Sequence, residues 1–208
     1  MAVLSTRPIG IICALPRELG DLYRNPPPDC RIVAGGMGAT AAERAARSLL
    51  DVQALISAGY AGGLAAPAAR GVIVVDTDSL AFDAPPPAVR GRIADSQTMV
   101  ATPEARARLA ALTGAIAVDM ESAAIARVAK ERGIPFAAIR IITDGPGDTL
   151  AINWDRYRCP DGSMRTASAV LDALRSTRGI AELLRLWYSS SEATRVLSAY
   201  LRRFLESR

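Results

Sequence analysis

The chain has 208 residues, half of them apolar, and a formal net charge of +4. This length and apolar content are enough to bury a substantial core, and we expect one domain over residues 1–208. Cys13, Cys30 and Cys159 lie far apart and the chain has no histidine, which argues against a metal site and predicts reduced cysteines in a cytoplasmic protein. Neither a signal peptide nor an apolar run of the roughly 18 residues that span a membrane is expected.

The positive charge comes almost wholly from arginine, because Lys130 is the only lysine. Arginine suits planar contact with carboxylate or phosphate, although such a bias also follows from genomic base composition. The arginines are spread along the chain and aromatic residues make up only 5% of it, so few side chains are available to stack on bases. We therefore expect no binding to nucleic acid.

Short apolar runs typical of strands alternate with longer runs of helical periodicity, which predicts an α/β fold with a largely parallel sheet buried on both faces. In chain order, we expect a strand at 8–14, a helix at 18–23 that the proline run 26–28 ends, a strand at 31–34, a helix at 40–50 and a strand at 54–58. These are followed by a strand at 71–76, a loop at 83–92, a helix at 103–112, a strand at 115–118, a helix at 121–132 and a strand at 136–142.

A glycine-rich segment follows the strand at 54–58, with the sequence Gly59-Tyr60-Ala61-Gly62-Gly63. Glycines permit positive φ and a close approach of the backbone to a ligand, which predicts a ligand-binding loop. A tight turn without a ligand is the alternative explanation.

The C-terminal segment 168–208 predicts two or three helices, because its apolar residues recur at helical spacing while arginines fill the other positions. Two explanations stay open for this pattern. The helices either cover the sheet, or they present a face that contacts a membrane surface.

Three carboxylates stand directly after predicted strands. Glu18 follows the first strand, Glu121 follows the strand at 115–118, and Asp144 ends the last strand. Ligands of open α/β sheets bind outside the carboxyl ends of the strands, so these acids are candidates for acid–base chemistry. Each alone also has an ordinary explanation, since Glu18 and Glu121 suit the first turn of a helix and Asp144 suits a turn.

Longer segments carry a resemblance to a known family. IGIICALPREL, SAGYAGGL and AVDMESAAIARVAKERGIPFAAIRIITD occur in the order seen in the purine nucleoside phosphorylase and methylthioadenosine/S-adenosylhomocysteine nucleosidase superfamily, over about residues 9–144. The resemblance implies a three-layer αβα fold around a mixed, partly barrel-like sheet. It also implies a homo-oligomer and an enzyme that cleaves the bond between a purine base and a ribose.

The resemblance implies roles for the acids and their neighbours. Asp144 would protonate or hydrogen-bond the purine at N7, which makes the base a better leaving group. Met120 and Glu121 would hold the ribose, with Glu121 on its 2′-hydroxyl. Asp119 stands where many relatives have glutamate.

Further substrate contacts are implied less specifically. Thr98 and Met99 lie roughly where relatives contact the base, and Gly59, Tyr60 and Ala61 resemble the segment beside the ribose. Tyr60 replaces the serine that most relatives carry, which leaves the identity of the nucleophile open.

The nucleophile is water or inorganic phosphate. Glu18 matches the glutamate with which the nucleosidases activate water, and this role needs a base within hydrogen-bond reach of the attacking oxygen. Arg17 lies near a position where phosphorylases carry a phosphate-binding arginine, and a guanidinium can hold phosphate with two hydrogen bonds. Phosphate would be a co-substrate, and no cofactor is expected.

The chain length, the VDMES variant and the sequence of segment 168–208 resemble the hopanoid-associated phosphorylase group, which implies adenine release from adenosylhopane. A lipid-linked substrate would bring a cytoplasmic enzyme to the inner membrane surface through 168–208. The alternatives are a methylthioadenosine/S-adenosylhomocysteine nucleosidase and a catalytically silent nucleoside-binding protein. A dinucleotide-dependent oxidoreductase is not expected, because the glycines at 35–38 lack the G-x-G-x-x-G spacing.

Overall fold

The computed structural model describes residues 7–79, 85–150, 154–157, 159, 163, 165–175 and 177–206. The strands are β1 Ile9–Cys13, β2 Cys30–Ala34, β3 Ala54–Gly63, β4 Ile73–Asp76, β5 Val89–Arg90, β6 Ile93–Asp95, β7 Ala117–Asp119 and β8 Phe136–Asp144. The helices are α1 Pro16–Leu19, α2 Asp21–Arg24, α3 Ala39–Ser48, α4 Pro103–Thr113, α5 Ser122–Arg132, α6 Thr166–Ala173 and α7 Thr177–Glu206, with a 3₁₀ turn, η1, at Trp154–Tyr157.

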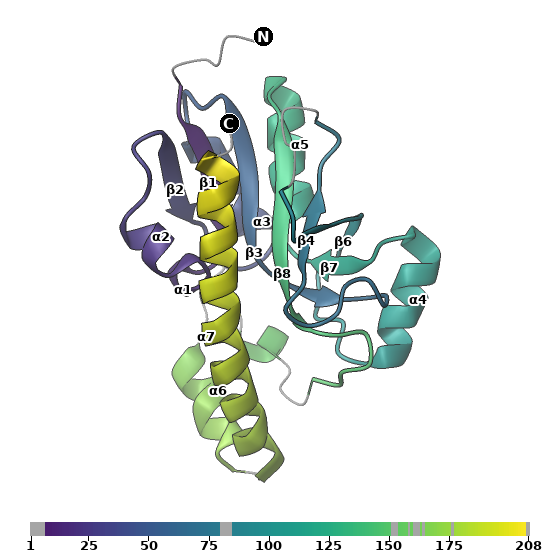
Figure 1. The fold of residues 1–208 in the computed structure, drawn as a ribbon. Coiled ribbons are helices and arrows are strands. Elements are labelled where there is room, and N and C mark those ends of the chain that lie inside the picture. The colour runs from purple at the N-terminus through teal and green to yellow at the C-terminus, as the bar shows by residue number, and fades with distance from the viewer. Residues whose placement is uncertain are drawn as a thin grey trace.

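The strands form one mixed sheet in the order β2-β1-β3-β8-β4-β5 (Figure 1). β2, β1, β3 and β8 run parallel to one another, whereas β4 runs antiparallel to β8 and β7 runs antiparallel to β3. β3 is the central strand, pairing with β8 along most of its length, with β1 over its first half and with β7 at its end. β6 pairs with β7, and the side chain of Asp76 accepts a hydrogen bond from the Ile93 nitrogen at 2.7 Å, which ties β6 to the end of β4.

Helices cover both faces of the sheet. On one face, α1, α2 and α7 bury apolar side chains against β1, β3, β4 and β8, while α3 and α5 pack together on the opposite face (Figure 1). The small alanines of α3 and α5 let these two helices approach the sheet and each other closely. The expected three-layer αβα fold with a mixed sheet is confirmed, and among the described strands no pairing closes the sheet into a barrel.

The C-terminal segment forms two helices, as expected. The second half of α7 packs on the sheet through residues spaced four apart, namely Ala193, Leu197, Leu201 and Leu205, which are all buried. This half therefore covers the sheet. The side chains of residues 177–189, where the other apolar positions of the segment fall, lie outside the described part of the structure. None of the described helices is both long and apolar enough to cross a membrane.

The prediction of a loop at 59–63 was wrong, because β3 continues through Gly63. A register shift between Ala61 and Gly62 bends the strand but does not end it. The glycines are needed for space, since a Cβ on Gly63 would lie only 2.1 Å from the Ala68 carbonyl oxygen, and none of the three has a positive φ. A glycine run can thus mark close packing inside a strand as well as a loop.

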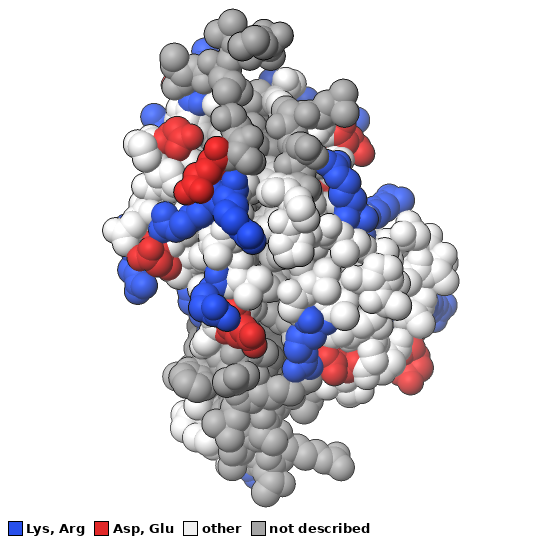
Figure 2. All heavy atoms as spheres, viewed as in Figure 1, with Lys and Arg blue, Asp and Glu red and all other residues white. Residues whose placement is uncertain are grey.

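Two smaller predictions were also wrong. The single helix expected at 18–23 is divided into α1 and α2 at Gly20, whose φ of 51° interrupts the helical path. The loop expected at 83–92 contains β5, which pairs in parallel with β4, while residues 80–84 lie outside the described part of the chain. On the face that carries α7, acidic and basic side chains lie interspersed and do not form one basic patch (Figure 2).

Candidate active site

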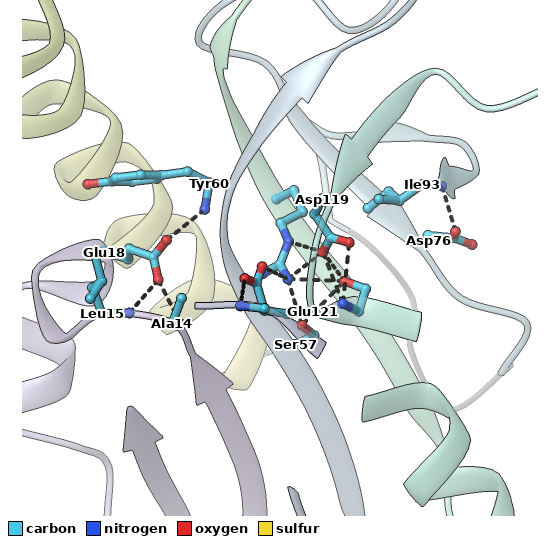
Figure 3. Close-up of polar contacts among 12 residues, drawn as sticks. Ala14, Leu15, Glu18, Ser57, Tyr60, Asp76, Ile93, Asp119 and Glu121 are labelled. Atoms are coloured by element: carbon cyan, nitrogen blue, oxygen red, sulfur yellow. Dashed lines mark hydrogen bonds and ion pairs between the residues drawn. The ribbon is translucent and has the colours of Figure 1, made fainter. Parts of the chain in front are cut away.

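Glu18 is a buried acid in the one-turn helix α1, just beyond the carboxyl end of β1. Its Oε2 accepts hydrogen bonds from the backbone nitrogens of Ala14 at 2.8 Å and Leu15 at 2.9 Å, and its Oε1 accepts one from Tyr60 N at 3.4 Å (Figure 3). Burial raises the pKa of Glu18, although these backbone donors and the charge of Arg140 oppose the shift. The carboxyl group is thus fixed in direction and disposed to take up a proton.

Arg140 of β8 occupies the middle of the site and is only 2% exposed. Its Nε donates to Asp119 Oδ2 at 2.6 Å, and its terminal nitrogen NH2 donates to Ser57 Oγ at 2.7 Å and Ser122 Oγ at 3.1 Å. Asp119 also accepts hydrogen bonds from the backbone nitrogen and hydroxyl of Ser122. Such a buried ion pair is tolerated only when the remaining polar atoms are satisfied, and here hydroxyl groups from β3 and α5 serve that purpose.

Glu121 precedes α5 and lies on the same guanidinium. Its Oε1 accepts a hydrogen bond from Gly38 N at 2.8 Å, and its Oε2 lies 3.9 Å from the terminal nitrogen NH2 of Arg140. Burial and the neighbouring Asp119 raise the pKa of Glu121 to about 7, against the opposing charge of Arg140. A carboxyl group with a pKa near neutrality can gain and lose a proton under ordinary conditions.

The surroundings of Gly59 show that Arg140 and Glu18 lie near each other. A Cβ placed on Gly59 would lie 3.1 Å from Glu18 Oε1 and 3.1 Å from the terminal nitrogen NH1 of Arg140. The two side chains therefore flank one small space beside the strand. The structure thus brings Glu18 and Glu121 around a shared arginine, as Figure 3 shows for the two acids.

Asp144 ends β8, four residues beyond Arg140, and belongs to a second arrangement. Its side chain forms an ion pair with Arg106 of α4, which is 1% exposed, and its Oδ1 accepts a hydrogen bond from Thr143 Oγ1 at 2.8 Å. Arg106 also donates to the carbonyl oxygens of Gly63 at 3.1 Å and Gly145 at 3.0 Å. The register of β3 and β8 pairs Gly59 with Arg140 and Gly62 with Asp144, so both arrangements lie along the same stretch of the central strand pair.

Three further predicted substrate contacts differ in their exposure. Met120 is half-buried between Asp119 and Glu121. Thr98 is exposed and Met99 is half-buried, with its backbone nitrogen donating to Asp155 at 2.7 Å. Their contact with a base stays a prediction.

The predicted residues nearest Glu18 differ in what their side chains do. Ala61 is buried in β3, and the phenol of Tyr60 makes its hydrogen bonds with α7. Arg17 has an exposed side chain and accepts a hydrogen bond from Thr194 through its carbonyl oxygen at 2.8 Å. Nothing in these contacts identifies a phosphate site, and phosphate binding by Arg17 stays a prediction.

Sequence reasoning missed the two arginines that organise the acids. Arg140 had a detectable signal, because it is the single charged residue inside the otherwise apolar run FAAIRII. A charge within a strand buried on both faces requires a buried partner. Arg106 gave no such signal, since it is one of two arginines in a helix without a distinct apolar face. Among the described residues, no group of histidine, cysteine, aspartate or glutamate side chains could hold a metal ion.

Comparison with known sequences gives two matches. The model of the phosphorylase superfamily matches residues 79–175, which include Asp119, Glu121, Arg140 and Asp144. The 5′-methylthioadenosine/S-adenosylhomocysteine nucleosidase of Treponema pallidum (strain Nichols) is 46% identical over 59 residues. That alignment covers 28% of this chain and 22% of the relative, so it spans less than a quarter of that protein.

Solved structures match over nearly the whole chain. The S-adenosylhomocysteine nucleosidase of Streptococcus pyogenes, in complex with 5-methylthiotubericidin, superposes with a TM-score of 0.69 over 99% of both chains at 20% identity. The futalosine hydrolase of Helicobacter pylori strain 26695 superposes with a TM-score of 0.69, over 98% of this chain and 99% of its own, at 14% identity. At such identities the likeness shows a shared fold. Together with the sequence matches, it makes the chain similar to the phosphorylase superfamily, whose model matches residues 79–175.

Proposed function

We propose that the protein is a purine nucleosidase that releases adenine from 5′-methylthioadenosine or S-adenosylhomocysteine by hydrolysis. The observation that carries the proposal is the pair of acids near Arg140 beside the central strand, the buried Glu18 and the mostly buried Glu121. Support also comes from the names of the relatives, since the Treponema pallidum protein is a 5′-methylthioadenosine/S-adenosylhomocysteine nucleosidase and the Streptococcus pyogenes protein an S-adenosylhomocysteine nucleosidase.

The reaction needs three contributions, and the acids divide them in this proposal. Glu18 takes the proton of the attacking water, a step favoured by the raised pKa of its carboxyl group. Glu121 binds the ribose hydroxyl next to the carbon where positive charge develops. Asp144 contacts the purine at N7 and assists its departure, with Arg106 fixing the direction of its carboxyl group.

Water is preferred over phosphate as the nucleophile because of the charges near Glu18. Its carboxyl group is surrounded by backbone donors that already bind it, and Arg140 is engaged by Asp119 and two hydroxyl groups. A phosphate dianion beside Glu18 would face like charge, whereas water would find a hydrogen-bond acceptor.

The test follows free adenine from methylthioadenosine and S-adenosylhomocysteine, each with and without inorganic phosphate. We expect release at the same rate in both conditions, with free sugar as the second product. Glu18→Gln and Asp144→Asn should each lower turnover by roughly 10²–10⁴-fold while the circular dichroism spectrum stays unchanged. A sugar phosphate among the products would replace hydrolysis with phosphorolysis, and full activity of Glu18→Gln would overturn the proposal.

A lipid-linked adenosine is the second candidate substrate. The observation that favours it is a pair of exposed leucines, Leu171 in α6 at 62% and Leu174 just after it at 53%, in the part of the molecule that projects beyond the sheet (Figure 1). Adenosine with a 5′-linked alkyl chain, offered in detergent micelles, separates the two substrates. Adenine release from this compound at least ten times faster than from methylthioadenosine would favour the lipid substrate and contact with a membrane surface.

A further inference from the structure

Tyr60 links the central strand to the C-terminal helix. Its backbone nitrogen donates to Glu18 Oε1 at 3.4 Å, while its ring points away from the sheet (Figure 3). The phenol oxygen lies 2.6 Å from Thr194 Oγ1 and 3.0 Å from the carbonyl oxygen of Ser190, both in α7. One residue therefore contacts the candidate base and the helix that covers it.

The hydrogen-bond geometry continues the link to the helix that carries Glu18. Thr194 Oγ1 lies 2.8 Å from the carbonyl oxygen of Arg17, which can only accept, so the threonine hydroxyl donates there. The single proton of Thr194 is then used, so the one phenol proton of Tyr60 is shared between Thr194 Oγ1 at 2.6 Å and the Ser190 carbonyl oxygen at 3.0 Å. The resulting chain of donors runs from Tyr60 through Thr194 to the backbone of α1.

Helix α1 needs such external support because it has only four residues. A single turn is not stable alone, since fixing its backbone is compensated by too few internal hydrogen bonds. Gly20, with a φ of 51°, separates α1 from α2 and removes support from that side. The position of the Glu18 backbone therefore depends on what packs against α1.

α7 holds α1 and α2 through a stripe of polar residues spaced four apart. Thr194 binds the Arg17 carbonyl, Ser198 Oγ donates to the Leu19 carbonyl at 2.6 Å, and Arg202 pairs with Asp21 at 2.8 Å. Of these three, Thr194 is the one whose hydroxyl group also contacts Tyr60. Ser198 and Arg202 therefore only attach α7 to α1 and α2, whereas Thr194 also links α7 to Tyr60, whose backbone binds Glu18.

We propose that Tyr60 and Thr194 are positioning residues that hold Glu18 for its reaction, with Thr194 fixing its backbone and Tyr60 its carboxyl group. The inference rests on the proposed function, because it assigns Glu18 the role of the base. This role explains why a tyrosine stands at position 60, where the family has a serine. The phenol fixes the strand to α7 and leaves the backbone nitrogen to direct Glu18.

The experiment compares four single variants, and the double variant of Thr194→Val with Tyr60→Phe, in adenine release from methylthioadenosine across pH 5–9. Thr194→Val removes the hydroxyl at nearly constant volume, Thr194→Ser retains it, and Tyr60→Phe removes the phenol oxygen. Ser198→Ala is the matched control, because Ser198 holds the same helix without contacting Tyr60. Thermal unfolding of each variant reports the structural cost of the lost hydrogen bond.

We expect Thr194→Val and Tyr60→Phe each to lower kcat by about tenfold, with KM within twofold and a shifted acidic limb of the pH profile. The double variant should lose no more than the single ones, because both break the same link. Thr194→Ser should retain wild-type kcat, and Ser198→Ala should lower the midpoint of unfolding without lowering kcat.

Two results would overturn the inference. One is a kcat of Thr194→Val and Tyr60→Phe equal to that of Ser198→Ala, and the other is a double variant whose losses multiply. Glu18→Gln in the same assay distinguishes this failure from failure of the proposed function. If Glu18→Gln is inactive while Thr194→Val is fully active, only the positioning roles fall, whereas an active Glu18→Gln removes the proposed base itself.

Discussion

Two buried arginines hold the acids of this protein in different ways. Arg106 forms an ion pair with Asp144 and hydrogen bonds with three carbonyl oxygens around it, so its charge acts on one acid and one turn. Arg140 closes on Asp119 and reaches Glu121 only at 3.9 Å. Burial and the charge of Asp119, which takes the close ion pair, raise the pKa of Glu121 to about 7 against the charge of Arg140.

The difference suits the two chemical tasks in the proposed reaction. The acid at the base must keep one direction, and a direct ion pair provides this. The acids at the ribose and the water must exchange protons or bind hydroxyl groups, and a more distant positive charge leaves them able to do so. The contrast teaches that an arginine near an acid can either fix its geometry or set its protonation, depending on what else the guanidinium contacts.

The largest expected effect comes from removing Arg140. Arg140→Met leaves Asp119 buried without its partner, and we expect the free energy of unfolding to fall by about 3–5 kcal/mol in urea titrations. Adding Asp119→Asn should recover most of this loss. Arg106→Met should also lower the free energy of unfolding, and adding Asp144→Asn to it should recover a smaller share of that loss. The reason is that the carbonyl oxygens that Arg106 binds stay unsatisfied. Equal recovery in the two pairs would contradict the distinction between the two arginines.

Glu121 gives a smaller effect that depends on pH. The folded-state pKa of about 7 lies above the ordinary value of 4.5, so between these values the folded protein binds more protons than the unfolded chain. The contribution of Glu121 to the free energy of unfolding is therefore largest below pH 4.5. It falls as pH rises from 4.5 toward 7, with a slope of up to about 1.4 kcal/mol per pH unit. Glu121→Gln should remove this component. Urea titrations at pH 5, 6 and 7 check it, and identical slopes for the two proteins would refute the shift.

The smallest expected effects come from substituting two glycines of β3. Gly59 lies beside Glu18 and Arg140, and Gly62 lies beside Asp144 and Arg106. A Cβ on Gly59 would meet Glu18 and Arg140 at 3.1 Å, and one on Gly62 would meet Asp144 Oδ2 at 3.0 Å. We expect Gly59→Ala and Gly62→Ala each to lower stability by about 1 kcal/mol. Gly59→Ala should also shift the pH profile of turnover, which Gly62→Ala should leave in place. Gly147→Ala, where a Cβ meets nothing within 4 Å, is the control.

The layers of the fold were predictable because they follow from periodicity. Apolar runs such as PIGIICA and FAAIRII predicted parallel strands buried on both faces, and the structure has β1 and β8 there. The glycines at 59–63 misled the prediction because local composition cannot distinguish a loop from a strand crowded by its neighbours. The neighbour in question, Ala68, shows its effect only through its position in space.

The acids of the candidate site were also named from the sequence, but their relations were not. Arg140 lies 122 positions from Glu18, and Arg106 precedes Asp144 by 38 positions, so neither pairing follows from spacing. The roles assigned to Glu18, Glu121 and Asp144 came from resemblance to a family. What the structure adds is the division of these acids between two guanidinium groups.

The central claim is that both arrangements serve one nucleoside. The most direct measurement is a crystal structure of the protein with a methylthioadenosine analogue whose glycosidic bond cannot be cleaved. We predict the base edge against Asp144, a ribose hydroxyl within hydrogen-bond distance of Glu121, and a water molecule on Glu18 facing the anomeric carbon. An analogue bound elsewhere, or one that contacts Asp144 but leaves Glu18 and Glu121 on the far side of β3, would contradict the account.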